Sequence, residues 1–320
     1  EVYTRGMFSK NKVSTIIAPS GSFGGSVPIN LNNPYLSATL RNQICAFDVN
    51  PSAAVYEARF SQAECDTAAT SAFGTAGYRQ TGTGAFVSAD TNGDGVIDTD
   101  EGYNDNPAIT LNRRTPEVGP RISDYQTTFF DYRVGVRGGI TDTLDWSIEG
   151  AYGESENIQT IQGYTLQSRF RQGSLVEGTL ANPVCQDASN GCVPVNIFGP
   201  EGSITPAAAG FLQENSQTTN RTSLSQVRAI ISGDLGFASP GAVQPIGFAL
   251  GGEYRKYTAQ QASDLLAKTP GELGGAGGAA PDIDGKYDVY EAYAEIVAPL
   301  IEDKPFFESL TLEAGIRYSD

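Results

Sequence analysis

The sequence predicts an all-β fold, an antiparallel transmembrane β-barrel segment with short periplasmic turns and long extracellular loops. Three observations carry this prediction. Stretches of about ten residues alternate between apolar and polar side chains, as strands with two different faces do. Aromatic residues recur near the ends of the apolar faces, as they do at membrane interfaces. The connections between the strands alternate between short and long, so that one end of the sheet carries tight turns.

The clearest element is a hairpin over Phe129–Tyr152 with a turn near residues 140–144. One face of the hairpin carries Phe130, Tyr132, Val134, Val136, Trp146, Ile148 and Tyr152, and the other carries Asp131, Arg133, Arg137, Asp145, Ser147 and Glu149. We expect the apolar set to face lipid and the charged set to face a lumen. Trp146 should then mark the periplasmic interface and Tyr152 the outer one.

The remaining strands are predicted at residues 1–13, 225–237, 245–257 and 287–299 and near 310–318, about seven strands in all. Long loops are expected at residues 14–120, 158–222 and 259–284. Two short helices are expected at Asn33-Pro34 and Thr205-Pro206, where a capping residue precedes a proline; a third could cover 51–68. Both ends of the chain fall within expected strands, so we expect residues 1–320 to be part of one barrel domain of a longer polypeptide.

The composition excludes several classes of function. A formal net charge of −16 argues against nucleic-acid binding, because phosphates require a basic surface. The chain has no histidine, which excludes Ser-His and Cys-His catalytic pairs and imidazole metal ligands. With no catalytic motif in the sequence, we do not expect an enzyme.

The four cysteines lie at positions 45, 65, 185 and 192. Four cysteines allow three pairings, and spacing alone does not select one. We favour the local pairs Cys45–Cys65 and Cys185–Cys192, which indicate an oxidising compartment. The alternative is a set of reduced cysteines in a cytosolic protein, although neither pair has the spacing of a zinc site.

The sharpest local motif is DTNGDGVIDTDE at residues 90–101, which matches the twelve-residue EF-hand calcium loop. Gly95 gives the sharp turn at position six, and the expected oxygen ligands come from Asp90, Asn92, Asp94, Val96 (backbone carbonyl), Asp98 and Glu101. Because no long flanking helices are evident, the motif predicts a structural Ca²⁺ site that orders an extracellular loop. The alternative is an acidic, solvated loop tip.

The charges on the polar faces form a second group of candidate functional residues. They could line a substrate path or contact a plug inside the barrel, or they could simply solvate and cross-link the barrel wall. For any single residue, the structural role is favoured. The group includes Asp131, Arg133, Glu149, Arg228, Glu253, Arg255, Glu291 and Arg317.

Several stretches together resemble TonB-dependent outer-membrane receptors. They are RRTPEVGPRISDYQTTFFDYRVGVRGGI (113–140), LDWSIEGAYGESE (144–156), CVPVNIFGPEGSITPAAAGFL (192–212), IGFALGGEYRK (246–256) and the run from 287 to 320; NPYLSATLR (33–41) is also similar to the first long loops of that family. The motifs are individually weak, and their consistent order carries the resemblance. The Asp90–Glu101 loop has no counterpart in the pattern.

The resemblance implies a barrel of about 22 strands around an N-terminal plug. It also implies active uptake of a scarce nutrient, such as a siderophore or a carbohydrate, across the bacterial outer membrane. The partners would be outer-membrane lipid, the small nutrient ligand and the TonB complex, which acts through a plug that these residues lack. The alternatives are a calcium-dependent structural or adhesive cell-surface protein without transport, and a passive porin.

Overall fold

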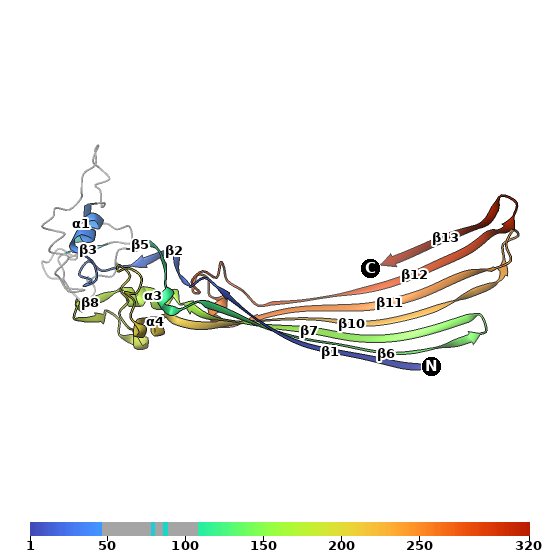
Figure 1. The fold of residues 1–320 in the computed structure, drawn as a ribbon, viewed down its shortest axis with the longest axis horizontal. Coiled ribbons are helices and arrows are strands. Elements are labelled where there is room, and N and C mark those ends of the chain that lie inside the picture. Colours follow the sequence, from blue (N-terminus) through green and yellow to red (C-terminus); the bar gives the residue numbers. More distant parts are fainter. Residues whose placement is uncertain (47–77, 81–85, 89–107) are drawn as a thin grey trace.

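The computed structural model describes residues 1–46, 78–80, 86–88 and 108–320, and long β-strands dominate it (Figure 1). Each strand of the main sheet pairs with its neighbours in antiparallel fashion, in the order β1-β6-β7-β10-β11-β12-β13. This order follows the chain, so the sheet is an up-and-down meander, as predicted. The sheet is open, with β1 and β13 at its edges. Its strands are β1 (Val2–Ile17), β6 (Arg121–Thr141), β7 (Leu144–Thr165), β10 (Gln213–Ala238), β11 (Pro245–Ser263), β12 (Ile283–Lys304) and β13 (Phe307–Ser319).

The connections of the main sheet differ strongly between its two ends (Figure 1). At one end, residues 142–143, 239–244 and 305–306 form tight turns. At the other end, the connections cover 18–120, 166–212 and 264–282. The predicted alternation of short and long connections is therefore confirmed, and all long loops emerge at the same end, here called the loop end.

The strands extend further toward the loop end than the sequence predicts. β7 continues to Thr165 rather than ending near 157, and β10 begins at Gln213 rather than 225. The alternation is lost there because both faces of these extensions carry Thr, Asn, Gln and Ser, which is the pattern expected when both faces are solvated. Cross-strand hydrogen bonds replace apolar contacts, for example from Asn157 Nδ2 to Thr127 Oγ1 at 2.8 Å.

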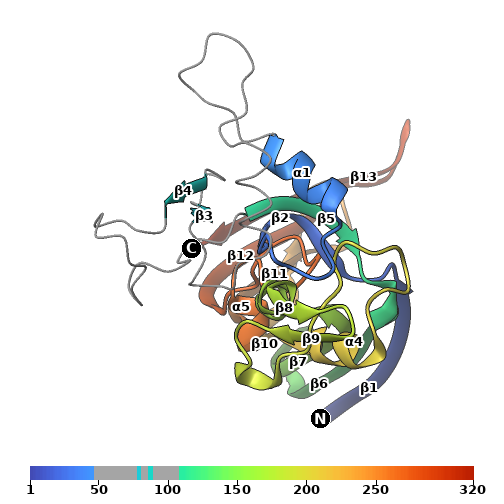
Figure 2. The same cartoon turned by 90° about the vertical axis from the view of Figure 1, so that its left-hand side faces the viewer.

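The long loops fold into small elements at the loop end. Figure 2 shows β8, β9 and α4 in front of the main sheet, which curves behind them from β1 through β6 and β7 toward β12. Three two-stranded sheets form there, β2–β5, β3–β4 and β8–β9. The elements are β2 (Gly21–Pro28), α1 (Ala38–Ala46), β3 (Tyr78–Gln80), β4 (Phe86–Ser88), β5 (Ala108–Arg114), η1 (Pro116–Val118), α3 (Gln167–Ser174), β8 (Val176–Thr179), β9 (Asn182–Cys185), η2 (Ser189–Gly191), α4 (Pro206–Leu212) and α5 (Leu265–Lys268).

The fully buried apolar side chains of the described residues also gather at the loop end. Phe170 of α3, Leu212 of α4 and Val195 are each 0% exposed and belong to one cluster with Val27 and Ile29. Two long connections, 18–120 and 166–212, therefore share one core. This core holds the loop elements in place on the sheet, because burying each such side chain contributes about 1.5–3 kcal/mol.

One of the predicted helices begins elsewhere. The helix expected at Asn33-Pro34 starts at Ala38, where Ser37 Oγ accepts a hydrogen bond from Leu40 N at 3.2 Å. Asn33 instead closes a turn by accepting from Tyr35 N, and its buried side chain donates to Ser174 O at 2.8 Å. An Asn-Pro pair also begins turns, so the cap signal was ambiguous.

The helix predicted at Thr205-Pro206 is confirmed as α4. Thr205 Oγ1 caps it by accepting from Ala208 N at 3.2 Å. The helix considered over 51–68 lies outside the described residues. No helix in the described part of the chain is both long and apolar enough to cross a membrane.

Candidate functional site

The register of the main sheet gathers apolar side chains on one continuous face. Ile231, for example, lies between Trp146 on β7 and Leu250 on β11. The side chains on this face are strongly exposed: Tyr132 is 64%, Val134 55% and Ile316 74% exposed. We call it the apolar face; it also includes Phe8, Phe130, Val136, Ile148, Tyr152, Val227, Phe248, Tyr254, Tyr290, Ile296, Leu312 and Tyr318. Soluble monomers rarely expose an apolar surface of this extent.

Tyrosines bound the apolar face toward the loop end. Tyr132 pairs with Tyr152, and the rings of Tyr254 and Tyr290 lie 4.9 Å apart. The Tyr152 hydroxyl donates to Glu154 at 2.7 Å, and the Tyr254 hydroxyl donates to Asp288 at 3.1 Å. These carboxylates lie nearer the loop end. The rings therefore cover apolar surface while their hydroxyls meet polar groups, an orientation typical of an apolar–water boundary.

The height of the apolar face follows from strand geometry. On β6, apolar residues of this face run from Phe130 to Ile140, which is ten residue steps (140 − 130). At ~3.3 Å per residue the run measures about 33 Å along the strand. Strands of membrane barrels tilt by about 40°, and at that tilt such a run would span about 25 Å, the height of their apolar band.

The opposite face of the sheet carries a ladder of ion pairs, here called the polar face. Glu149 on β7 lies 3.5 Å from Arg133 and 3.6 Å from Arg228, and it accepts from the Tyr3 hydroxyl. It thereby connects β1, β6, β7 and β10. The Glu149 side chain is 13% exposed, so its charge requires these partners.

A second part of the ladder connects β11, β12 and β13. Arg255 Nε lies 3.1 Å from Glu253, and both Arg255 and Arg317 form ion pairs with Glu291. The side chains of Glu253 and Glu291 are 9% and 6% exposed. The polar residues singled out from the sequence thus neutralise one another across the sheet, which supports their structural role as cross-links between strands.

Above the ladder, a groove of about 650 Å³ opens on the polar face. Tyr257 and Tyr287 stack beside it with ring centroids 4.8 Å apart, and Phe129 lines it from β6. Small residues form the floor, among them Gly153 and Gly285. The rings offer a flat group of a ligand a stacking surface, and Asp131, Glu154 and Lys286 also line the groove. Sequence reasoning missed the groove, because its signal is a pairing of aromatic and small residues across strands.

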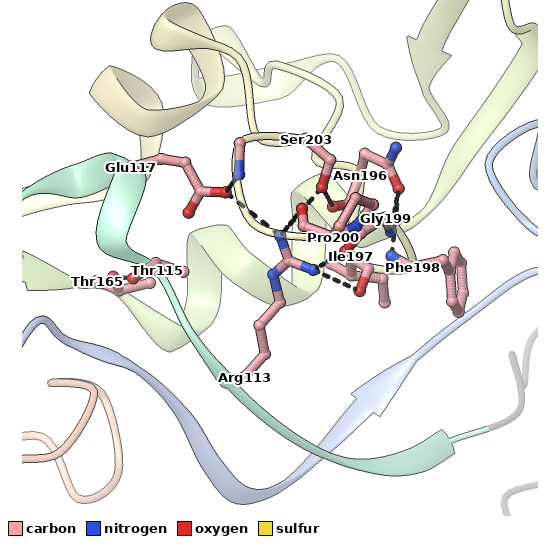
Figure 3. Close-up of polar contacts among 11 residues, drawn as sticks. Arg113, Thr115, Glu117, Thr165, Asn196, Ile197, Phe198, Gly199, Pro200 and Ser203 are labelled. Atoms are coloured by element: carbon pink, nitrogen blue, oxygen red, sulfur yellow. Dashed lines mark hydrogen bonds and ion pairs between the residues drawn. The ribbon is translucent and has the colours of Figure 1, made fainter.

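Arg113 anchors the turn at 196–203 to β5 (Figure 3). Its guanidinium donates to the backbone carbonyls of Ile197 and Gly199, to Pro200 O at 3.2 Å and to Ser203 Oγ at 3.1 Å, and it lies 3.4 Å from Glu117. The Arg113 side chain is 13% exposed. One arginine therefore satisfies acceptors from a loop more than eighty residues away.

Further contacts complete this cluster. Glu117 Oε1 also accepts from Gly202 N at 2.8 Å, and Asn196 Oδ1 accepts from Gly199 N at 3.0 Å. The hydroxyls of Thr115 and Thr165 lie 2.6 Å apart (Figure 3). The stretches RRTPEVGPR (113–121) and VNIFGPEGS (195–203), which are distant in sequence, thus meet in space.

The local disulfide Cys185–Cys192 is confirmed, and it connects β9 to the segment after η2. The pair Cys45–Cys65 cannot be placed, because Cys65 lies outside the described residues. The predicted Ca²⁺ ligands Asp90, Asn92, Asp94, Val96, Asp98 and Glu101 also lie outside them. Within the described residues, no three His, Cys, Asp or Glu side chains cluster as metal ligands would.

We expect the double substitution Cys185→Ser, Cys192→Ser to lower the local free energy of unfolding around the β8–β9 hairpin by about 2.5 kcal/mol. The reason is that the bond, which begins at the end of β9, closes a loop of about eight residues. Hydrogen exchange of residues 176–192 measures the effect. Wild-type protein treated with a reductant should match the double variant. Unchanged exchange would show that the hairpin is held by its backbone contacts alone.

Comparison with known proteins yields no match to a family model, a curated protein or a solved structure. The structure itself defines a mostly β chain built on an open antiparallel sheet with one apolar and one polar face. Function therefore has to be argued from these two faces and from the loop end.

Proposed function

We propose that this chain forms part of the barrel wall of a TonB-dependent transporter in the bacterial outer membrane. The observation that carries the proposal is the exposed apolar face, which runs about 33 Å along β6 and is bounded by tyrosines toward the loop end. At the tilt of barrel strands this run would match the height of an outer-membrane apolar band. In water this surface would favour aggregation, whereas lipid would cover it without any exposure of apolar side chains to water. The resemblance of the sequence to TonB-dependent receptors agrees with this assignment.

The open edges of the sheet support a barrel of more strands. β1 and β13 each present one row of unpaired backbone groups, which lipid does not tolerate. We infer that further strands pair with both edges and close the wall. The polar face then lines the lumen, where its ion pairs contact water and the plug.

In this proposal, a scarce nutrient binds among the loops and the upper lumen, and the TonB complex acts on the plug to open a path. The proposed role includes no enzymatic step. The long connections at one end match external loops, and the tight turns match the periplasmic side.

Uptake by cells tests the proposal. Deletion of the gene should abolish growth on one limiting nutrient from a panel of ferric siderophores, oligosaccharides and cobalamin, and the full-length gene should restore it only in cells with a functional TonB complex. Restoration without TonB would indicate a passive porin. Growth that is unchanged on every nutrient would contradict transport.

A calcium-dependent adhesive role remains the second candidate, favoured by the EF-hand-like loop at residues 90–101. We expect the full-length protein to bind Ca²⁺ in calorimetry and Glu101→Gln to weaken binding at least tenfold, because this substitution removes the bidentate ligand. Equal heats for both proteins would contradict the calcium site. Loss of cell adhesion on chelation, with uptake intact, would favour the adhesive role.

A further inference from the structure

A cavity of about 430 Å³ lies at the loop end between α3, β2 and a glycine-rich segment of the loop before β12. The segment contributes Gly271, Gly274, Gly275, Gly277 and Gly278, and α3 contributes Gln167 and Arg171. Gln167 and Arg171 lie four positions apart on a helix and therefore share one face. The cavity contains no residue of the polar groove or of the Arg113 cluster.

The base of the glycine-rich segment is firmly attached. Gly274 N donates to Thr165 O at 3.0 Å, and Arg121 donates to Gly275 O at 2.9 Å. Glu272 is 8% exposed, and its carboxylate accepts from the backbone and hydroxyl of Ser168. The one carboxylate on this segment is therefore occupied by α3 and does not line the cavity.

The donors around the cavity are free. Arg171 is the only charged residue that lines it, and its guanidinium forms no hydrogen bond or ion pair within the described residues. The backbone N–H groups of Gly275, Gly277 and Gly278 likewise have no acceptor there. Gly275 and Gly277 have positive φ angles of 77° and 87°, and backbones that change handedness in this way turn N–H groups toward anions.

A buried acceptor completes the arrangement. Gln167 is 8% exposed, and its Nε2 donates to Gly21 O at 3.1 Å, which fixes the orientation of the amide. Its Oε1 accepts no hydrogen bond in the described part of the chain and lies 4.0 Å from the position a Cβ would take on Gly25, which also lines the cavity. A ligand for this cavity therefore needs both an anionic group and a donor.

We propose that this cavity is a recognition site for a small hydroxylated anion, such as a sugar acid or a sugar phosphate. The anionic group would meet Arg171 and the glycine N–H groups, and a hydroxyl of the ligand would donate to Gln167. This inference rests on the proposed function, because it names the class of ligand that the external loops select. Arg171 supplies the one charge that lines the cavity, so an anionic ligand should bind more tightly than a neutral ligand of similar shape.

Binding of gluconate, glucose 6-phosphate and glucose to the full-length protein in detergent tests the inference by calorimetry. At least one anion should bind tenfold or more tightly than glucose, and Arg171→Gln should remove that preference. Arg221→Gln, which changes the net charge equally but lies outside the cavity, should retain it. Binding of glucose as tightly as both anions, or of none of the three, would overturn the inference.

A second pair of variants tests the same inference without changing α3. Gly278 has an ordinary φ, and a Cβ there would meet nothing within 4 Å, so the position accepts a side chain. Gly278→Asp should weaken anion binding at least tenfold by repulsion, while the isosteric Gly278→Asn should weaken it far less. Equal effects would overturn the inference. Because binding in detergent needs neither TonB nor uptake, its failure is distinct from a failure of the transport proposal.

Discussion

Ile231→Arg is expected to destabilise the membrane-inserted protein by about 2–4 kcal/mol, the cost of an arginine near the middle of a lipid-facing strand. Ile231 lies midway along the apolar run of β10, between Val227 and Phe237, and it is 42% exposed. Urea titration of the full-length protein folded into lipid vesicles measures the free energy of unfolding. The amount of protein in the outer membrane should fall accordingly.

The neighbouring residue provides a matched control. Ile230 lies on the polar face, where it pairs with Ser147 and Gly251. An arginine there would enter a solvated lumen beside Asp145, so Ile230→Arg should change stability by less than about 1 kcal/mol. Similar costs for the two substitutions would show that both faces meet the same solvent and would contradict the membrane assignment.

The contrast between Ile230 and Ile231 also shows why the sheet could be predicted from the sequence. Where one face meets an apolar environment and the other meets water, side chains must alternate. This alternation predicted the strands of the main sheet, although it is weak in β1. Toward the loop end polar side chains such as Asn157 and Thr127 become common on both faces, so the alternation weakens. The predicted strands therefore stop several residues short of the loop end.

The loop end was far less predictable, because its contacts join residues distant in sequence. α4 has a local capping signal at Thr205 and was predicted, but α3 has no side-chain cap and was not. Arg113 and its acceptors near Pro200 are separated by more than eighty residues, and nothing in either stretch reveals the other. The free Arg171 is likewise recognisable only once the glycine-rich segment lies against it.

Arg113→Lys is expected to lower the local stability of the 196–203 turn by about 3 kcal/mol. The planar guanidinium bridges the Gly199 and Pro200 carbonyls and Glu117 at once, which a single ammonium on a flexible stem cannot do. Each buried acceptor left without a donor costs about 1–3 kcal/mol. Hydrogen exchange in this turn should accelerate roughly a hundredfold.

The adjacent arginine provides the control for this prediction. Arg114 donates to Pro19 O at 3.0 Å and lies over the Phe23 ring, contacts that leave its guanidinium exposed. Arg114→Lys should therefore alter exchange in the 196–203 turn by less than threefold. If both substitutions accelerate exchange equally, the loop end is held by its apolar core rather than by Arg113. If only Arg113→Lys does so, a single polar cluster fixes the loop that follows β7, and with it the shape of the surface at the loop end.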